Sequence, residues 1–490
     1  MSARLFHRLV YDQGQARMPP LQNPDIDIEC DVAVIGAGTA GLAAERSARR
    51  AGARTLLIDD CFAGTTCASV GCMPSKLLIA AAKTAHSIGL STQFGIRLGN
   101  VTIDGKAVME RVRALRDAFV ASALESINGL PEEAKLKGWA TFISGDSFAV
   151  NGQTIHAKSV VIATGSRPSI PKMFDGMKNI LTNETVFEID ELPPSLAVVG
   201  AGPLGLELAQ AFSRLGVDVT VFDQGDTVSA LKDDNVATSL RTLLEREFAI
   251  HLNVNINASQ SGETIDISWS GASAGRKRFT HVLVAAGRLP NLGGLGLANT
   301  GLELDDHGTP LFDRQTMQCG KSSIFIAGDC DAELPVLHEA SAEGAIAGNN
   351  AARFPDVRPS NRSTPLAITF TDPPSASIGE PAGENTIVGM SDFSDQGRAK
   401  VEARNAGLIR IYADNEGRLT GATIAAPEGE HFAHLIAWAV EDHLTAMQLL
   451  EKPFYHPTYE EGLRSALKQI CEQTRLPFGQ DRDAGSSPGV

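Results

Sequence analysis

The chain reads Asp31-Val32-Ala33-Val34-Ile35-Gly36-Ala37-Gly38-Thr39-Ala40-Gly41 at the point that decides its fold. The apolar run predicts a buried strand, and the glycines predict a tight turn into a helix that ends at about Ala51. Gly36 permits the turn, Gly38 lets a pyrophosphate approach the backbone, and Gly41 lets the helix pack closely on the strand. A phosphate bound there would meet the free N–H groups of a helix N-terminus.

A short predicted strand over residues 55–58 completes this βαβ unit and ends in Asp59. An acid at this place accepts hydrogen bonds from ribose hydroxyls. A glycine triplet alone is a weak signal, but here the strand, turn, helix and acid follow the order of a dinucleotide-binding unit. We therefore predict a nucleotide site at this unit.

The same order recurs in the middle of the chain. A predicted strand (196–199), a turn with Gly200, Gly202 and Gly205, a helix (206–215) and a strand (217–222) lead to Asp223. An acid there binds the ribose 2′-hydroxyl and repels a 2′-phosphate, and no arginine follows closely in residues 224–226. The second unit therefore predicts a second dinucleotide site and favours NAD over NADP.

The rest of the chain divides into a leader, a C-terminal region and a tail. We expect residues 1–30 to form a leader in which early prolines interrupt regular structure. Within it, Met1–Val10 is either dispensable or a short amphipathic helix for docking or targeting. Beyond about Arg362, predicted strands (367–370, 408–412, 420–425) lead into predicted helices (430–441, 460–472), which indicates a separate α+β domain. Residues 477–490 are polar and predict a disordered tail.

The composition excludes several classes of protein. A formal net charge of -15 makes nucleic acid and anionic membrane surfaces unfavourable partners. The sequence has no apolar run long enough to cross a bilayer. Seven cysteines in 490 residues do not form a disulfide scaffold, so we expect a cytoplasmic protein with mostly reduced thiols. Any disulfide in it would be catalytic.

The segment Gly64-Thr65-Thr66-Cys67-Ala68-Ser69-Val70-Gly71-Cys72-Met73-Pro74-Ser75-Lys76 carries the strongest chemical signal. Two cysteines at this spacing in a regular helix have Cα atoms about 8–9 Å apart, whereas a disulfide needs about 4.4–6.8 Å. A Cys67–Cys72 bridge therefore requires an irregular turn, for which Gly71 supplies flexibility. Pro74 suits the first position of a following helix. Zinc is not indicated, because no second Cys/His pair lies nearby in the sequence, and we predict no metal site. The other possibility is two unrelated buried cysteines.

A second candidate segment, His456-Pro457-Thr458-Tyr459-Glu460-Glu461, lies near the C-terminus. Dithiol chemistry needs a base because the thiolate is the attacking species, and histidine titrates in the right range. A carboxylate can orient the ring of such a base. Taken alone, however, a histidine before a proline is more often an ordinary surface or core residue.

With these residues in order, the chain resembles the pyridine nucleotide–disulfide oxidoreductases from about Asp31 to Cys471, and the cysteine segment is highly specific to that family. The resemblance implies an α/β fold with two Rossmann-like nucleotide-binding domains, one for FAD and one for NAD, and a C-terminal α+β dimerisation domain. The implied boundaries are 31–160 and 285–360 for the FAD-binding domain, 161–284 for the NAD-binding domain and 361–476 for the dimerisation domain.

The resemblance also implies roles for single residues. Cys72 would be the thiolate that faces the flavin, and Cys67 would exchange with substrate. His456 would be the base, contributed by the other subunit of an obligatory homodimer, and Glu461 would polarise it. Lys76 would sit by the flavin and pair with Glu207. The implied contacts are Gly36, Gly38, Gly41, Asp59, Lys76, Ala163, Thr164, Gly165 and Asp329 for FAD, and Gly200, Gly202, Gly205, Glu207, Asp223 and Gly287 for NAD.

Within the family, the combination of Asp223, Gly205 and the His456/Glu461 pair is most similar to the dihydrolipoamide dehydrogenases. Glutathione reductases usually take NADPH and have alanine at the place of Gly205, and mercuric reductases have tyrosine at the place of His456. The resemblance therefore implies oxidation of free or protein-bound dihydrolipoamide with NAD, and a lipoylated carrier protein as partner.

The chain departs from the family pattern at a few places. Thr65 replaces a glycine before the first cysteine, aspartate stands at positions 59 and 223 where glutamate is commoner, and the leader is long. Three alternatives stay open. They are an NAD(P)H-dependent reductase of another, glutathione-like disulfide, a diaphorase that reduces quinones or metals without a dithiol step, and a docking subunit of a larger assembly.

Overall fold

The computed structural model describes residues 27–476. The predicted tail, the possible helix Met1–Val10 and the rest of the leader up to residue 26 lie outside the described residues. Within residues 27–476, every helix is too short or too polar to span a bilayer.

The first sheet is built around the strand of the first glycine turn. Its strands lie in the order β3-β2-β1-β6-β5-β4, and β17 also pairs with β6. Their bounds are β1 (Asp27–Ile35), β2 (Thr55–Asp59), β3 (Lys135–Lys137), β4 (Ala140–Phe142), β5 (Ser147–Val150), β6 (Gln153–Ile162) and β17 (Ile324–Ile326). β1 pairs in parallel with β2 and β6 and is buried on both faces, as its apolar run predicts. It begins at Asp27 rather than Asp31, because Asp27–Cys30 extend the ladder along β6. The predicted leader boundary at residue 30 is therefore too late by this short stretch.

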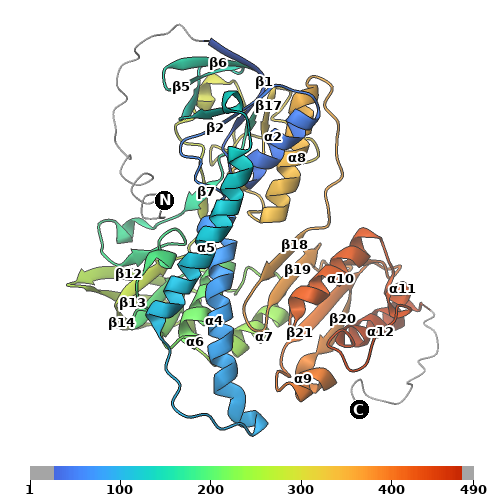
Figure 1. The fold of residues 1–490 in the computed structure, drawn as a ribbon. Coiled ribbons are helices and arrows are strands. Elements are labelled where there is room, and N and C mark those ends of the chain that lie inside the picture. The colour runs from blue at the N-terminus through green and yellow to red at the C-terminus, as the bar shows by residue number, and fades with distance from the viewer. Residues whose placement is uncertain (1–26, 477–490) are drawn as a thin grey trace.

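Helices α2 (Thr39–Arg50) and α8 (Leu337–Arg353) lie side by side against this sheet (Figure 1). Their contact depends on glycine: a Cβ at Gly344 would lie 2.1 Å from the Ala40 carbonyl oxygen, and one at Gly348 would lie 2.1 Å from that of Ala44. Helix α3 (Thr66–Ser69) and the long pair α4 (Cys72–Leu90) and α5 (Gly105–Asn128) follow β2. Figure 1 shows this pair running from the first sheet down beside the second domain.

The second sheet repeats the plan with parallel strands in the order β11-β10-β9-β15-β8. Its elements are β8 (Ile180–Leu181), β9 (Ser195–Val199), α6 (Pro203–Arg214), β10 (Asp218–Phe222), α7 (Asp234–Leu244), β11 (Ala249–His251) and β15 (His281–Val284). An antiparallel sheet of β12 (Val254–Ser261), β13 (Thr264–Gly271) and β14 (Gly275–Phe279) covers one face, where Ile265 and Ile267 pack against Val282 and Phe222. The chain enters and leaves this domain through the antiparallel pair β7 (Ser166–Pro168) and β16 (Arg288–Pro290).

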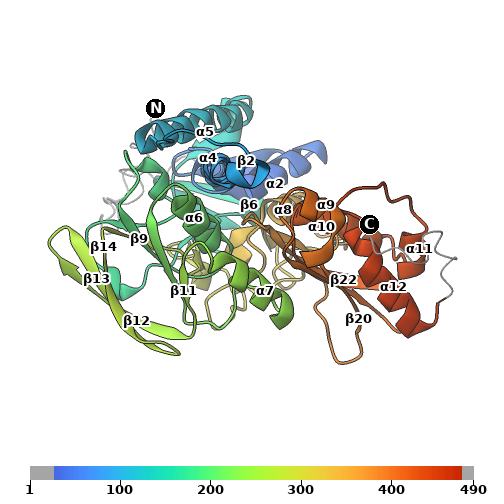
Figure 2. The same cartoon turned by 90° about the horizontal axis from the view of Figure 1, so that it is seen from below.

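The C-terminal domain is an antiparallel sheet with helices on it. The strand order is β18-β19-β22-β21-β20, with β18 (Leu366–Thr369), β19 (Ser375–Gly379), β20 (Ile387–Asp392), β21 (Leu408–Ala413) and β22 (Leu419–Ala425). The helices are α9 (Gly397–Val401), α10 (Gly429–Glu441), α11 (Ala446–Leu450) and α12 (Gly462–Thr474). Phe432 and Ile436 of α10 and Leu467 of α12 fill its core. Figure 2, from below, shows this domain beside the second one, with α7 near their junction.

Short 3₁₀ helices connect these elements at Ser91–Phe94, Glu132–Ala134, Lys172–Phe174, Val186–Glu188, Leu297–Asn299, Asp329–Asp331 and Phe393–Asp395. The arrangement confirms the predicted fold class: two doubly wound nucleotide-binding units and a separate α+β domain.

Candidate active site

The first glycine turn has the geometry that its sequence predicts. Gly36 has φ +108°, and a Cβ there would lie 2.2 Å from the Ala163 carbonyl oxygen. A Cβ at Gly41 would lie 1.8 Å from the Gly36 carbonyl oxygen, so strand and helix meet backbone to backbone. At Gly38, no described atom lies within 4 Å of an added Cβ. Helix α2 begins at Thr39, and its N-cap makes no side-chain hydrogen bond among the described residues. The turn therefore presents uncapped N–H groups on an open side.

Asp59 braces this turn. One carboxylate oxygen accepts a hydrogen bond from the Ala37 N–H at 2.8 Å, and the other accepts from the N–H groups of Cys61 and Phe62. The second unit repeats the bond, since Asp223 accepts from the Ala201 N–H at 2.5 Å and the Gly225 N–H at 2.6 Å. Both acids thus hold their own turns, and their predicted contacts with ribose would use the remaining lone pairs.

The second glycine turn has the same backbone contacts as the first. Gly200 has φ +117°, and a Cβ there would lie 2.3 Å from the Ala285 carbonyl oxygen. A Cβ at Gly205 would lie 2.0 Å from the Gly200 carbonyl oxygen. At Gly202, as at Gly38, no described atom comes within 4 Å of an added Cβ. Gly287, with φ +103°, lies where the chain leaves this domain and accepts a hydrogen bond from the Ser169 N–H.

The two cysteines lie on either side of a break between helices. Cys67 is in α3, Cys72 is the first residue of α4, and the chain bends at Val70 and Gly71. A Cβ at Gly71 would lie 2.9 Å from the Thr66 carbonyl oxygen, so glycine is needed for the bend. The predicted irregular turn is therefore confirmed. The predicted helix start is wrong: α4 begins at Cys72, because the break falls at Gly71, and Pro74 sits two residues further on, within the first turn, where N–H groups have no intrahelical partner.

This geometry makes the two thiols chemically different. A hydrogen bond from the Cys67 thiol, together with the Lys76 ammonium, lowers the pKa of Cys72 to about 7, although burial opposes the shift. The same hydrogen bond, with burial, raises the pKa of Cys67 well above its usual range. Cys72 also stands at a helix N-terminus, which favours a thiolate. The thiolate that this pair forms near neutral pH therefore resides on Cys72 and not on Cys67.

Lys76 is fixed by a carboxylate from the second domain. Its Nζ donates to Glu207 Oε2 at 2.8 Å and lies 4.4 Å from the centre of the Phe370 ring. Glu207 Oε1 accepts from the Phe370 N–H at 2.8 Å. The predicted Lys76–Glu207 pair is therefore present, and Glu207 links the cysteine helix to α6 and to the C-terminal domain.

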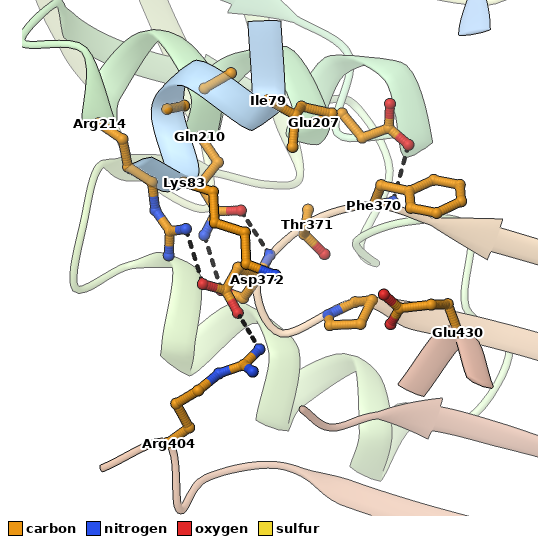
Figure 3. Close-up of a pocket in the computed structure, with 13 residues that line it drawn as sticks. Ile79, Lys83, Glu207, Gln210, Arg214, Phe370, Thr371, Asp372, Arg404 and Glu430 are labelled. Atoms are coloured by element: carbon orange, nitrogen blue, oxygen red, sulfur yellow. Dashed lines mark hydrogen bonds and ion pairs between the residues drawn. The ribbon is translucent and has the colours of Figure 1, made fainter. Parts of the chain in front are cut away.

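Figure 3 shows the neighbouring pocket, in which two further side chains of α6 hold the segment after β18. Arg214 pairs with Asp372 at 2.8 Å, and Gln210 accepts a hydrogen bond from the Asp372 N–H at 2.7 Å. Arg404 pairs with the same carboxylate at 3.0 Å. Although burial opposes it, these two guanidinium groups hold the pKa of Asp372 below its usual range. Sequence reasoning missed this polar contact between domains.

One cavity brings together four of the nine residues predicted to contact FAD, whereas Gly36, Gly41, Asp59, Lys76 and Thr164 do not line it. It is lined by Gly38, Thr39, Ala163, Gly165 and Asp329 and by both Cys67 and Cys72. The Ala163 N–H donates to the Ile35 carbonyl, and the Thr164 carbonyl accepts from Asn291, so this predicted turn closes against β1. Asp329 accepts from Ser166 Oγ at 2.9 Å and lies 3.6 Å from Arg288 Nε. Asn183 and Arg288 also line the cavity, and sequence reasoning did not single them out.

The cavity fits the predicted flavin nucleotide. Uncapped N–H groups at the start of α2 suit a pyrophosphate, and Gly38 leaves room for it. The Asp329 carboxylate can accept hydrogen bonds from hydroxyl groups, and the cysteine pair opens into the same space.

His456 and Glu461 form a separate pair in the C-terminal domain. The His456 Nδ1 lies 3.0 Å from Glu461 Oε2, which also accepts from the Thr458 N–H at 3.1 Å. Glu461 is buried, whereas 58% of the His456 side chain is exposed. The described residues that line the cysteine cavity all come from Gly38–Ala340, so a single chain does not bring His456 to the cysteines.

Comparison with known proteins agrees with this organisation. Residues 30–344 match the family model described as pyridine nucleotide-disulphide oxidoreductase, and residues 366–467 match the dimerisation domain of that family. The chain is 30% identical to a dihydrolipoyl dehydrogenase of Haloferax volcanii over 92% of its length and 98% of the relative's. It is 30% identical to one of Bacillus subtilis, covering 89% and 97%.

Solved structures have the same fold. LpdA from Mycobacterium tuberculosis is 25% identical, with a TM-score of 0.77 over 90% of this chain and 99% of that one. The Cu(II) complex of the HOCl-induced flavoprotein disulfide reductase RclA from Escherichia coli is 21% identical, with a TM-score of 0.77 over the same shares. At this identity, the likeness to RclA concerns the fold alone.

These matches confirm FAD and NAD as the predicted cofactors and a homodimer as the assembly. The likeness to the relatives extends from the first glycine turn through the C-terminal sheet, and the chain belongs to the pyridine nucleotide-disulphide oxidoreductase family.

Proposed function

We propose that this chain is a dihydrolipoyl dehydrogenase, which oxidises free or protein-bound dihydrolipoamide through a Cys67–Cys72 redox disulfide and reduces NAD⁺. The observation that carries the proposal is the cysteine pair, whose two thiols differ in pKa and open into the cavity that begins at α2. Relatives of that name, matched over nearly their whole length, support the choice of substrate. A lipoylated carrier protein would be the partner, in a cytoplasmic setting where other thiols stay reduced.

The exchange step follows from the asymmetry of the pair. A thiolate of dihydrolipoamide attacks Cys67 Sγ, the Cys67–Cys72 bond breaks, and Cys72 leaves as the thiolate. A low pKa makes Cys72 the better leaving group, which favours attack at Cys67. The second substrate thiolate then attacks the substrate sulfur of the mixed disulfide. Lipoamide is released with a new S–S bond, and Cys67 takes up a proton.

The substrate thiols must lose protons, and His456 of the partner subunit would accept them. Glu461 holds the Nδ1–H of the ring, so that Nε2 is left as the proton acceptor on an exposed side chain. The homodimer would complete each cysteine cavity with the opposite C-terminal domain, because one chain does not place the two together.

The remaining residues would hold the cofactors. FAD, when bound, supplies two-electron chemistry between the dithiol and the nicotinamide. Gly36, Gly38 and Gly41 would receive its pyrophosphate, with Asp59 and Asp329 as acceptors for its hydroxyl groups. Gly200, Gly202, Gly205 and Asp223 would do the same for NAD, and an aspartate at that place disfavours a 2′-phosphate.

Steady-state reduction of NAD⁺ by dihydrolipoamide tests the proposal. The flavin-loaded dimer should turn over, Cys67→Ser should abolish lipoamide turnover, and His456→Gln should lower kcat about 10²–10⁴-fold. The Cys67→Ser variant should keep NADH-dependent reduction of a quinone dye, which does not need the dithiol. Wild-type lipoamide turnover in Cys67→Ser would exclude the proposed mechanism. Quinone reduction by the parent without any lipoamide turnover would instead identify a diaphorase.

A further inference from the structure

The bend that separates the two cysteines is held by a residue far away in the sequence. Val70 is the last residue before Gly71, and its carbonyl oxygen accepts a hydrogen bond from Asn183 Nδ2 at 3.1 Å. Both groups are buried, and only 3% of Asn183 is exposed. A carbonyl at a helix break lacks the intrahelical partner of a continuous helix, so this bond satisfies a group that the bend leaves open.

Asn183 is itself fixed from the cofactor side of the cavity. Its Oδ1 accepts a hydrogen bond from Arg288 Nη1 at 3.5 Å. Arg288 donates to both the hydroxyl and the carbonyl of Ser166 at 2.7 Å, and lies beside Asp329. The amide therefore has a carbonyl on its donor side and a cation on its acceptor side. Aspartate could keep only the second of these contacts, and leucine could keep neither.

The bend decides whether the two sulfurs meet. Residues five apart in a continuous helix would hold the two Cα atoms too far apart for a disulfide. The hydrogen bond between the thiols also exists only because the chain turns at Val70 and Gly71. Gly71 permits this turn but does not fix it, because glycine has more backbone freedom than any other residue type. The hydrogen bond from the Asn183 amide to the Val70 carbonyl restrains the chain just before Gly71.

We propose that Asn183 is a positioning residue that holds the Val70–Gly71 link and thereby keeps Cys67 within hydrogen-bond and disulfide reach of Cys72. The inference rests on the proposed redox role of that pair. Among the described contacts, the Asn183 side chain hydrogen-bonds with Val70 and Arg288 and with neither sulfur. If the amide is lost, the link relaxes, the Cys67 thiol donates less well to Cys72, and the thiolate becomes less stable.

The test uses the flavin-loaded dimer and the variant Asn183→Leu, which has similar size and no donor. Iodoacetamide reacts with the thiolate, so the rate of Cys72 alkylation in the reduced protein, resolved by fragment mass spectrometry, gives the pH midpoint of that thiol. The midpoint should lie near 7 in the parent and rise by about one pH unit in Asn183→Leu, which slows alkylation at pH 7 about fivefold.

Asn179→Leu is the matched control. Asn179 Nδ2 also donates to a backbone carbonyl, that of Glu263 at 2.9 Å, but on the exposed side of the same domain. It should leave the Cys72 midpoint unchanged. An unchanged midpoint in Asn183→Leu that keeps its flavin would overturn the inference. If Asn183→Leu does not fold, Asn183→Asp keeps the shape and the contact with Arg288, and an unchanged midpoint in that variant counts equally against it.

A dithiothreitol redox titration of the parent separates this inference from the proposed function. If Cys67 and Cys72 never form a reversible disulfide, the proposed function fails whatever Asn183 does. If the disulfide forms in the parent and titrates at the same potential in Asn183→Leu, with the same Cys72 midpoint, only the role of Asn183 fails.

Discussion

In both nucleotide units the first glycine of the turn takes a positive φ, +108° at Gly36 and +117° at Gly200. In both, the acid after the second strand accepts a hydrogen bond from the residue that follows this glycine. The helices that leave the two turns differ. The outer face of α2 is a row of small residues packed on Gly344 and Gly348 of α8.

The outer face of α6 carries Glu207, Gln210 and Arg214, all engaged with other parts of the chain. Helix α2 meets a helix of its own domain, whereas α6 faces the cysteine helix and the C-terminal domain. The two turns therefore share a conformation because their local sequences are alike, whereas the residues on the outer face of each helix differ because the helices pack against different neighbours. Close apolar contact suits a permanent seam inside a domain, and paired charges suit a junction between domains.

The largest change in stability should follow from removing Asp372, which pairs with Arg214 of α6. In Asp372→Asn, Arg214 and Arg404 lose a shared partner, and Arg214 is nearly fully buried. Removing one member of a buried ion pair costs about 3–5 kcal/mol, and the lower end of that range applies here because Arg214 keeps Glu247 and Arg404 keeps Glu428 as partners. The free energy of unfolding in urea, at a fixed dimer concentration, should fall by about 3 kcal/mol near pH 7. The exposed pair Asp218–Lys277 supplies a control, since Asp218→Asn should change stability by less than about 0.5 kcal/mol.

The same pair of variants gives a pH test. The pKa of Asp372 is lowered in the folded protein, so its stabilising contribution is complete above the unfolded pKa and is lost as pH falls through the folded one. The difference between the parent and Asp372→Asn should therefore be constant near neutrality and shrink below about pH 4. A difference that persists undiminished in acid would mean that the contact is not ionic.

Alanine at the first glycine of each turn should have a smaller energetic effect, and each substitution should weaken binding of a different cofactor. An alanine Cβ at Gly36 or Gly200 meets a carbonyl oxygen and adds strain at positive φ, which costs about 2–3 kcal/mol. Gly36→Ala should purify without its visible flavin absorbance. Gly200→Ala should keep the flavin and bind NAD at least about tenfold more weakly, a loss of about 1.4 kcal/mol.

Two further glycines separate strain from collision. Gly52 follows α2 with φ +92°, Gly216 follows α6 with φ +93°, and no described atom lies within 4 Å of a Cβ at either. Gly52→Ala and Gly216→Ala should therefore bear only the strain and keep both cofactors. Equal flavin loss in Gly36→Ala and Gly52→Ala would show that the contact with Ala163 does not matter.

The smallest effect should come from replacing Lys76, which pairs with Glu207 of α6, and it should appear in the pH midpoint of Cys72 alkylation. The Cys67 hydrogen bond is the main cause of the lowered Cys72 pKa, and Lys76 is a lesser one. Lys76→Met removes a cation that favours the thiolate, so the alkylation midpoint of Cys72 should rise above about 7, by less than about one pH unit. Lys83→Met, further along α4, serves as the control. A fall in the midpoint of Lys76→Met would contradict the assigned direction.

What the sequence predicted well is local. The glycine turns, their strands and the helices after them need only adjacent residues, and their predicted bounds lie close to the observed ones. The five-residue spacing of the cysteines was enough to require a bend at Gly71, because helix and disulfide geometry conflict. The partner of Lys76 came from family resemblance, since no periodicity connects it to Glu207.

What the sequence did not show depends on distant contacts. Asn183 lies in a turn with no chemical signal of its own, and its meaning appears only beside Val70. The segment Phe370–Asp372 looks like an ordinary turn before two prolines, yet it meets three side chains of α6. The sheet of β12, β13 and β14 was also not predicted. His456 and the cysteines are separated within one chain, so the roles drawn for them together remain a prediction about the dimer.

The carboxylate of Glu207 has a consequence for how this molecule can be divided into domains. One oxygen holds the lysine next to the thiolate, and the other holds the backbone of Phe370 at the start of the C-terminal domain. The domain that carries the dimerisation match therefore also supplies part of the wall around Lys76. A chain trimmed to its two nucleotide-binding domains would not be a smaller enzyme awaiting a partner. It would have an uncovered Glu207 carboxylate and a less firmly held Lys76 beside its cysteine pair.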